Sequence, residues 1–175
     1  MAEPETPTGD RGWRSALLYV LLFVLVLGAL GVGGWYYLGR KANQRDAETA
    51  GRLNEKLAVR QQALSDEECE QLLALSDSPE WETRLLAINL TAASAKGWGG
   101  HPPRPDLAAR VVPVAVRLLA DPDTRVRRQA LNALRGLGAK EHIGAIRPLL
   151  QAADPRERQA AEEAVAALTA GEPAK

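Results

Sequence analysis

The sequence predicts an all-α protein with a single transmembrane helix, a helical stalk and a short α-solenoid of about three helix pairs. Three observations lead to this fold class. Residues 15–39 contain no Asp, Glu, Lys or Arg. A motif that opens with Asp and Pro recurs in the later part of the chain. Apolar residues in and around these motifs are spaced three and four positions apart, as the buried face of a helix requires.

The first two elements are a disordered tail over residues 1–14 and the uncharged run Ser15–Gly39. The tail is rich in acids and Pro and has little to bury. At about 1.5 Å per residue, a helix over the run spans roughly 37 Å, more than the roughly 30 Å hydrocarbon core of a bilayer. We therefore expect a single-pass anchor in the cell membrane.

Aromatic side chains lie near both ends of the run, at the depth where amphipathic rings favour the membrane interface. They are Trp13, Tyr19, Trp35, Tyr36 and Tyr37. The rival interpretation is a cleaved signal peptide, with Arg11 and Arg14 as its positively charged start. The anchor is favoured because the run exceeds the usual length of about 7–15 apolar residues and no good cleavage site ends it.

Basic residues flank the run on both sides, with more of them on the C-terminal side. They are Arg11, Arg14, Arg40, Lys41 and Arg45. The positive-inside rule therefore favours a cytoplasmic C-terminal region. Ala29 and Gly33 stand four positions apart, a spacing that lets two membrane helices approach closely and form a homodimer. Ordinary lipid-facing glycine is the alternative.

Residues 40–64 are polar and rich in helix-forming residues, which predicts a helical stalk or linker. Leu53, Leu57 and Leu64 share one helical face, but Arg60 interrupts this seam. A weak coiled coil and a solvated single helix both remain open.

The predicted solenoid covers residues 65–170, before a disordered tail over residues 171–175. Three of its segments share a pattern, in which Asp and Pro are followed nine or ten residues later by Ala beside a bulky apolar residue. The segments begin at Asp77, Asp121 and Asp154, and their alanines are Ala87, Ala130 and Ala164. Each segment predicts the second helix of a pair, and the small alanine lets a neighbouring helix come close.

Capping residues mark where these helices begin. Asp121 and Asp154, each followed by Pro, are expected to cap two of the second helices, and Ser78 the other. For the first helices of the pairs, Ser65 begins a capping box and Asp106 is the expected cap of the next. The last of them is predicted as one helix over residues 140–152, with a Pro inside it.

The segment from residue 105 to 170 resembles the HEAT-repeat family, in particular its short bacterial version, the phycocyanin-lyase-like repeat. The residues that carry the resemblance are Asp121-Pro122, Val126-Arg127, Ala130-Leu131, Ala133-Leu134, Leu137-Gly138 and Ile146-Arg147-Pro148-Leu149-Leu150. The first copy has Thr83 in place of the valine, and the third copy lacks the Val-Arg pair. The resemblance implies a solenoid that acts as a scaffold.

Charge is unevenly spread along the solenoid, although the formal net charge of the chain is zero. Residues 65–83 hold seven acids and no basic residue, and residues 104–158 are mainly basic. The acidic segment is a candidate for engaging the basic face of another copy.

Two groups of residues are candidates for binding a partner. Trp98, His101 and Arg104 lie in a Gly- and Pro-rich loop that either presents them for recognition or folds back over the core. Arg127, Arg128 and Arg135 lie on one helix and either form a basic ridge or make structural contacts. A ridge would suit an acidic protein or anionic lipid headgroups. Nucleic acid is not expected, because few aromatic residues are interleaved for base stacking.

We expect no catalytic residues, no cofactor and no metal, because Cys69 and the two histidines form no cluster of ligand-like spacing. The predicted function is a membrane-anchored protein-interaction module that acts as a scaffold or accessory subunit at the membrane surface. Its protein partner is not identified. There are two alternatives. One is a structural subunit packed through its transmembrane helix. The other is a tetrapyrrole lyase-like protein, which the resemblance to phycocyanin-lyase-like repeats implies.

Overall fold

The computed structural model describes residues 39–171. The chain divides into two compact units, Met1–Ala42 and Asn43–Lys175. Of the first unit, residues 39–42 are described, and they are helical. The predicted tails, the membrane run before Gly39 and all five predicted membrane-interface aromatics lie outside the described residues. Among residues 39–171, no helix has the length and apolar character needed to cross a bilayer.

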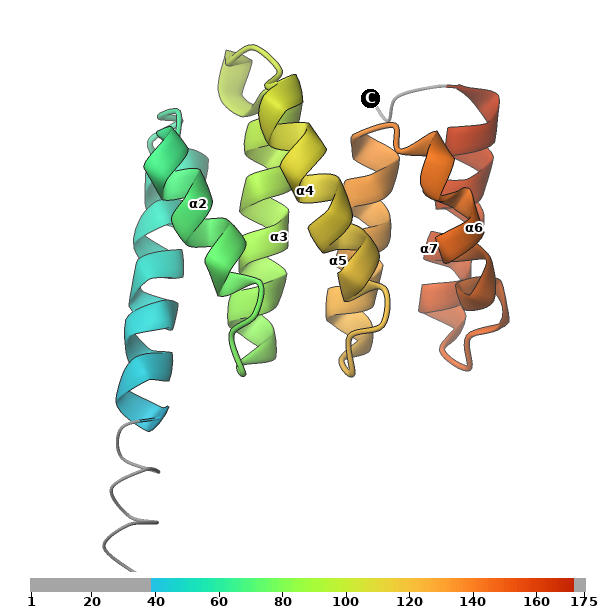
Figure 1. The fold of residues 1–175 in the computed structure, drawn as a ribbon, viewed down its shortest axis with the longest axis horizontal. Coiled ribbons are helices and arrows are strands. Elements are labelled where there is room, and N and C mark those ends of the chain that lie inside the picture. Colours follow the sequence, from blue (N-terminus) through green and yellow to red (C-terminus); the bar gives the residue numbers. More distant parts are fainter. Residues whose placement is uncertain (1–38, 172–175) are drawn as a thin grey trace, which may run out of the picture. The chain divides into compact units, whose positions relative to one another are not determined.

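The second unit contains helices and no strand within its described residues, which confirms the all-α class (Figure 1). The helices form two layers that run side by side. The layer that we call the B layer contains a helix over residues 43–54, the π-helical turn Glu55–Val59, α3 (Trp81–Lys96), α5 (Thr124–Gly136) and α7 (Pro155–Ala170). The A layer contains α2 (Asp66–Leu75), α4 (Pro105–Leu118) and α6 (Ile143–Ile146).

Successive helices alternate between the two layers. α3 packs against α2, α4 and α5, and α5 packs against α4 and α7. Every repeat therefore contacts its sequence neighbours, which is the organisation of an α-solenoid.

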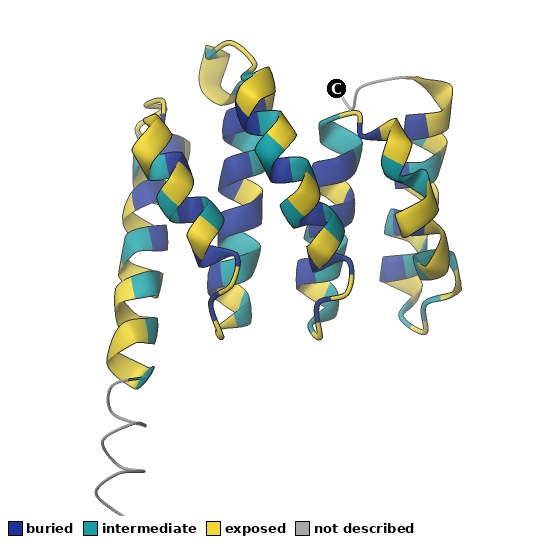
Figure 2. Cartoon of the chain, viewed as in Figure 1, coloured by how far each residue is buried: buried dark blue, intermediate teal, exposed yellow. Residues whose placement is uncertain are grey.

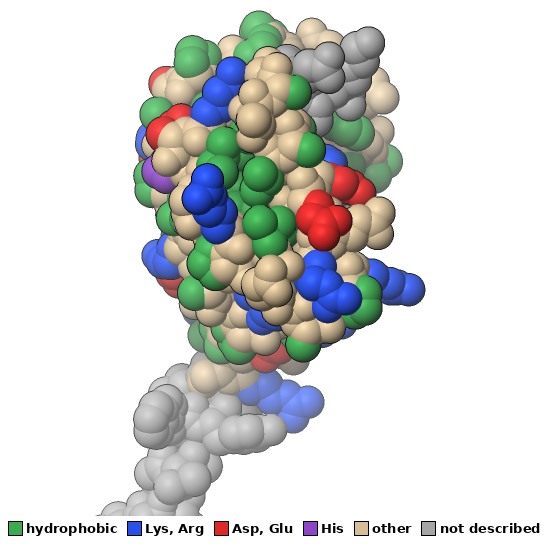
Figure 3. Space-filling model, turned by 90° about the vertical axis from the view of Figure 1, so that its right-hand side faces the viewer, with side chains coloured by type: hydrophobic (Ala, Val, Ile, Leu, Met, Phe, Trp, Pro, Cys, Tyr) green, Lys and Arg blue, Asp and Glu red, His purple; other side chains and the backbone are tan. Residues whose placement is uncertain are grey.

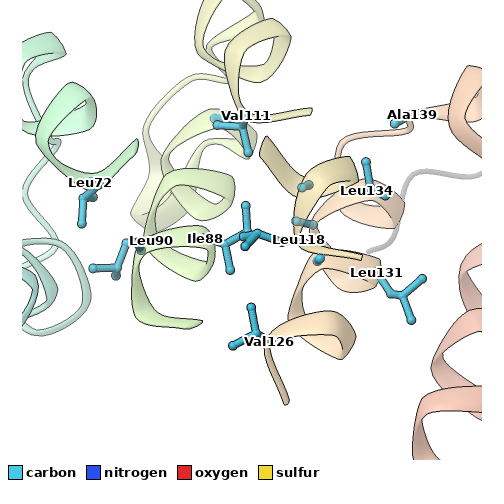
Figure 4. Close-up of a cluster of buried hydrophobic side chains, with 14 of the residues drawn as sticks. Leu72, Ile88, Leu90, Val111, Leu118, Val126, Leu131, Leu134 and Ala139 are labelled. Carbon is cyan, nitrogen blue, oxygen red and sulfur yellow. The ribbon is translucent and has the colours of Figure 1, made fainter. Parts of the chain in front are cut away.

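The core runs continuously between the layers. Each helix turns a buried stripe toward it and an exposed stripe toward solvent (Figure 2). Ile88, Leu118 and Val126, from α3, α4 and α5, belong to one hydrophobic cluster (Figure 4). Ala87 and Ala130 of the repeated motif are buried in the same cluster, as their small size predicts.

The helix over residues 43–59 shares this core. Leu53 and Leu57 are 1% and 2% exposed and lie in the same cluster as the repeat helices. Lys56 Nζ lies 2.6 Å from a carboxylate oxygen of Glu68 on α2. The apolar face that the sequence indicates is therefore packed against the solenoid, and from residue 43 onward the solvated helix is not observed.

Two of the predicted caps are confirmed. The Ser65 hydroxyl accepts from the Glu68 N–H at 3.2 Å, and the Glu68 carboxylate accepts from the Ser65 N–H at 2.8 Å. Lys56 and this N–H hold the pKa of Glu68 below its ordinary value. Asp154 accepts from the Arg156 N–H at 2.8 Å and so caps α7.

The other predicted caps are wrong. Asp123 caps α5 by accepting from the Arg125 N–H at 2.8 Å. The Asp121 carboxylate accepts from the Asp123 N–H at 2.9 Å and from Arg84, ahead of the first turn of the helix. Ser78 makes no capping hydrogen bond, and α3 follows Glu80. α4 begins at Pro105, so Asp106 lies inside its first turn.

The predicted helix over residues 140–152 is broken into three short pieces. The 3-10 turn Lys140–His142 leads into α6, and the 3-10 helix Arg147–Gln151 follows it. Pro148 stands at the start of that last piece. Its ring and missing N–H prevent α6 from continuing. In contrast, Pro113 is accommodated inside α4.

Candidate interaction surface

Arg84 on α3 joins its own repeat to the next one. Its Nη1 donates to the carbonyl oxygens of Ser78 and Pro79 at 2.8 and 2.9 Å. Its Nε and Nη2 donate to both carboxylate oxygens of Asp121 at 2.7 and 2.9 Å. This bidentate contact is charge-assisted, and Asp121 Oδ1 also accepts from the Asp123 N–H at 2.9 Å.

Arg127 on α5 repeats the arrangement one junction later. Its Nη1 donates to the carbonyls of Asp121 and Pro122, and its Nη2 donates to a carboxylate oxygen of Glu157 on α7 at 2.8 Å. Glu157 is 1% exposed. Of the three ridge arginines that the sequence proposes, Arg127 is therefore committed to a structural contact inside the solenoid.

Arg158 on α7 is the third member of the series. Its Nη1 donates to the carbonyls of Ala152 and Ala153 at 2.6 and 3.0 Å. The repeating pairs are Thr83-Arg84, Val126-Arg127 and Glu157-Arg158. The third copy thus keeps the arginine of the pair, and Glu157 takes the place of the valine because it reaches back to Arg127.

Three of the seven acids in the acidic segment form ion pairs with arginines in α4 or just before it. They join Asp66 to Arg104, Glu70 to Arg110 and Asp77 to Arg117. These carboxylates already face counter-charges in the neighbouring repeat. The three carboxylates stay 86%, 60% and 65% exposed, so the engagement of another copy by the acidic segment stays a prediction.

The loop between α3 and α4 is held down by two of its three candidate residues. Arg104 Nη1 donates to the Leu64 carbonyl at 3.0 Å, and His101 Nε2 lies 3.0 Å from the Gln61 carbonyl oxygen. Gly97 has a φ of +91°, and an added Cβ there would lie 2.4 Å from the His101 carbonyl. Trp98 remains 52% exposed, so the loop presents this residue.

A hollow of about 460 Å³ lies between α3 and α5, with Trp98 at its edge. Its walls are mainly small or apolar, and they include Ala92, Ala93 and Leu137. Two polar residues of α5, Gln129 and Asn132, complete its floor.

A second hollow of about 460 Å³ lies between α5 and α7. Arg125, Arg128 and Arg156 line it. Gln129 and Asn132 line this hollow as well as the first. The two hollows are therefore one continuous surface across α5, which we call the B-layer groove.

The arginines of the groove differ in how they are held. Arg125 donates to Asp123 at 2.7 Å, and its guanidinium lies 3.1 Å from the centre of the Trp81 ring. The hydrogen bond from the Arg125 side chain lowers the pKa of Asp123 to about 2. Arg135 pairs with Glu163 at 2.9 Å. The Nε atoms of Arg128 and Arg135 are buried and have no hydrogen-bond partner.

At the C-terminal end of the solenoid, α7 has an exposed glutamate where the earlier B-layer helices have a buried apolar residue. Four residues after each structural arginine stand Ile88, Leu131 and Glu162. The first two are fully buried between repeats, and Glu162 is exposed. Charged side chains surround the hydrophobic ones on this end (Figure 3). This face therefore combines an apolar centre with a charged rim.

Cys69 is a core residue, as its position among leucines predicts. It is fully buried, and burial raises the pKa of its thiol. Within residues 39–171, no group of His, Cys, Asp and Glu is arranged to hold a metal ion.

Sequence reasoning finds only part of this surface. Trp98, Arg128 and Arg135 line the groove, whereas Arg127 lies beneath it in the structural series. Gln129 and Asn132 are missed, because nothing in the linear sequence shows that α3, α5 and α7 present adjacent faces.

Comparison with protein families finds one match. Residues 69–166 match the family described as HEAT repeats. Comparison with curated proteins and with solved structures gives no match.

Proposed function

The chain belongs to the HEAT-repeat family, and from this premise we propose that it is a membrane-anchored protein-interaction module. In this proposal it acts as a scaffold or accessory subunit at the membrane surface. HEAT repeats are helical modules whose extended surfaces commonly mediate protein–protein contacts. The partner binds in the B-layer groove, and the anchor holds the complex at the membrane.

The observation that carries the binding role is the B-layer groove. It runs between the long helices of three repeats, with the half-exposed Trp98 at one edge. Trp and Arg are the side chains that most often dominate protein–protein binding energy, and the groove contains both. The polar C-terminal end favours binding along the side of the solenoid over binding at that end.

The membrane part of the proposal rests on the sequence. The run Ser15–Gly39 has the length and the uncharged character of a spanning helix. The excess of basic residues after it favours a cytoplasmic solenoid.

The test is a pull-down of the full chain in mild detergent, with bound proteins identified by mass spectrometry. Asn132→Trp fills the centre of the groove, because Asn132 is exposed and lines both hollows. Ala109→Trp is the matched control, because Ala109 is exposed on α4 in the opposite layer. A stoichiometric partner should be captured by the wild type and the control and lost from Asn132→Trp.

If the wild type and both variants capture the partner equally, the partner does not bind in the B-layer groove. Binding through the transmembrane helix would then be the better interpretation. Circular dichroism of each variant checks that the helical content is unchanged.

A further inference from the structure

Two guanidinium groups in the B-layer groove have no counter-charge. Arg125 is paired with Asp123, and Glu163 is shared by Arg135 and Gln159. Within the described part of the chain, the side chains of Arg128 and Arg156 make no hydrogen bond and no ion pair. The α5–α7 half of the groove therefore carries an excess of positive charge.

The side chain of Arg128 also has a hydrogen-bond donor without an acceptor. Its Nε atom is buried and has no hydrogen-bond partner. A buried donor without a partner destabilises the protein that contains it, because the hydration it loses is not replaced. The terminal Nη atoms of Arg128 make no hydrogen bond or ion pair within residues 39–171, so a carboxylate in the groove would give this side chain the short charge-assisted bonds that guanidinium groups prefer.

The middle of the groove suits a polypeptide backbone. Asn132 is exposed, and its amide makes no hydrogen bond within residues 39–171. An amide of this kind both donates and accepts, so it can pair with the N–H and the C=O of an extended chain. Gln129 beside it is positioned by a 2.8 Å hydrogen bond to Asn89.

The other half of the groove is lined mostly by small and apolar residues, with Asn89, Lys96 and Arg135 among them. Trp98, Ala92 and Leu137 line it, and no carboxylate does. A ligand that follows the whole groove therefore meets an apolar surface at one end and two unpaired guanidinium groups at the other.

We propose that the B-layer groove binds an extended acidic segment of the protein partner, with carboxylates on Arg128 and Arg156 and a large apolar side chain against Trp98. This inference rests on the proposed function and specifies the chemistry of the partner. A peptide is favoured over a lipid headgroup because the site includes a backbone-pairing amide and an apolar half, in addition to positive charge.

The test selects peptides from a library of short random sequences displayed on phage. The full chain in mild detergent is the target, and Asn132→Trp removes binders that do not use the groove. We expect the selected peptides to be enriched in Asp and Glu and to carry a Trp, Phe or Leu beside them. A selection without acidic enrichment overturns the inference.

Affinities of one selected peptide then locate the contact. Fluorescence anisotropy should show roughly tenfold weaker binding to Arg128→Met and to Arg156→Met. Arg147→Met is the matched control, because Arg147 is exposed on the last A-layer segment and lies outside the groove. Replacing the acids of the peptide by Gln should weaken binding to the wild type and have little further effect on the Arg128→Met variant. Equal affinity for all variants contradicts the inference.

Stability separates a binding role of Arg128 from a structural one. Arg128→Met removes the unpartnered donor, so the free chain should melt at an equal or higher temperature while its peptide affinity falls. A lower melting temperature would assign the side chain to the structure of the solenoid and contradict its role as an anchor.

The remaining outcomes distinguish the inference from the proposed function. Asn132→Trp could lose the partner in the pull-down while Arg128→Met and Arg156→Met retain it. This result would support the B-layer groove as the binding site and contradict the inference that the bound segment is acidic. Arginine-dependent binding to vesicles of phosphatidylcholine and phosphatidylserine, without peptide binding, would replace the peptide by a lipid headgroup.

Discussion

At the residue scale, the series Arg84, Arg127 and Arg158 ties each B-layer helix to the turn before it. Each guanidinium donates to two backbone carbonyls of that turn. Arg84 and Arg127 also reach an acid of the following repeat. The same side chain therefore completes the turn and fixes the neighbouring repeat.

Glu157→Gln should destabilise the solenoid strongly. The variant leaves the buried guanidinium of Arg127 without its counter-charge, which we expect to lower the free energy of unfolding by about 3 kcal/mol. Urea unfolding followed by circular dichroism measures the change. Glu163→Gln is the control, because its 49% exposed side chain forms a surface pair worth less than about 1 kcal/mol. Equal effects of the two variants would contradict the assignment.

Asp123 should make the stability of the protein depend on pH in strong acid. Its folded pKa of about 2 lies below the ordinary value of 3.8, because Arg125 stabilises the carboxylate. The stabilisation is complete above about pH 4 and is lost as the pH falls toward 2. Melting temperatures between these pH values should fall more steeply for the wild type than for Asp123→Asn. Parallel curves would exclude this contribution.

Local rules predict some of these residues and miss others. The Ser65 capping box is predicted because both partners lie three positions apart. Asp121 is predicted as a cap, but its carboxylate accepts hydrogen bonds from the side chain of Arg84, 37 positions earlier. A contact over that separation depends on the stacking of repeats, which capping rules do not include.

At the element scale, the helix over residues 43–59 completes the B layer beside α2. Its leucines lie at the spacing of a coiled-coil seam, so the sequence shows an apolar face. What that face packs against is not encoded locally. The observed core assigns it to the solenoid.

Leu53→Ala should test this assignment. Removing most of a side chain that is 1% exposed should lower the free energy of unfolding by about 2–4 kcal/mol. The control is Val59→Ala on the same helical segment, where the side chain is 72% exposed and the change should stay within about 0.5 kcal/mol. Similar melting temperatures for Leu53→Ala and the wild type would indicate that the segment does not contribute to the core.

At the scale of the whole molecule, α7 turns a charged residue toward solvent at a position where the earlier B-layer helices bury an apolar one. Glu162 stands where α3 and α5 have Ile88 and Leu131, which are buried between repeats. Restoring an apolar residue should recreate a surface of the kind that joins neighbouring repeats.

Glu162→Leu should therefore promote self-association through the C-terminal end. The expected result is a concentration-dependent increase in mass by analytical ultracentrifugation of the chain in detergent, with the wild type measured in parallel. Glu162→Gln keeps the end polar and should behave as the wild type does. An unchanged mass for Glu162→Leu would show that this end is closed by more than a single charge.

The sequence predicts the repeat architecture better than the surface it builds. Helical periodicity and the Asp-Pro openings act within one repeat, and they predict α5 and α7 well. The B-layer groove arises where three repeats meet, so Asn132 and Arg156 have no local signature. The sequence predicts Arg128 by its charge alone, whereas its lack of a counter-charge depends on the pairing of Arg125 with Asp123 and of Arg135 with Glu163.

The arginine contacts also take their acids from two different places. At the first junction the acid comes from a turn, at Asp121, and at the second it comes from inside a helix, at Glu157. A copy of the third repeat stacked after Arg158 would bring it a glutamate from within a helix, and a copy of the second repeat would bring it an aspartate from a turn. Both repeats are therefore compatible neighbours for Arg158 in an engineered, longer array.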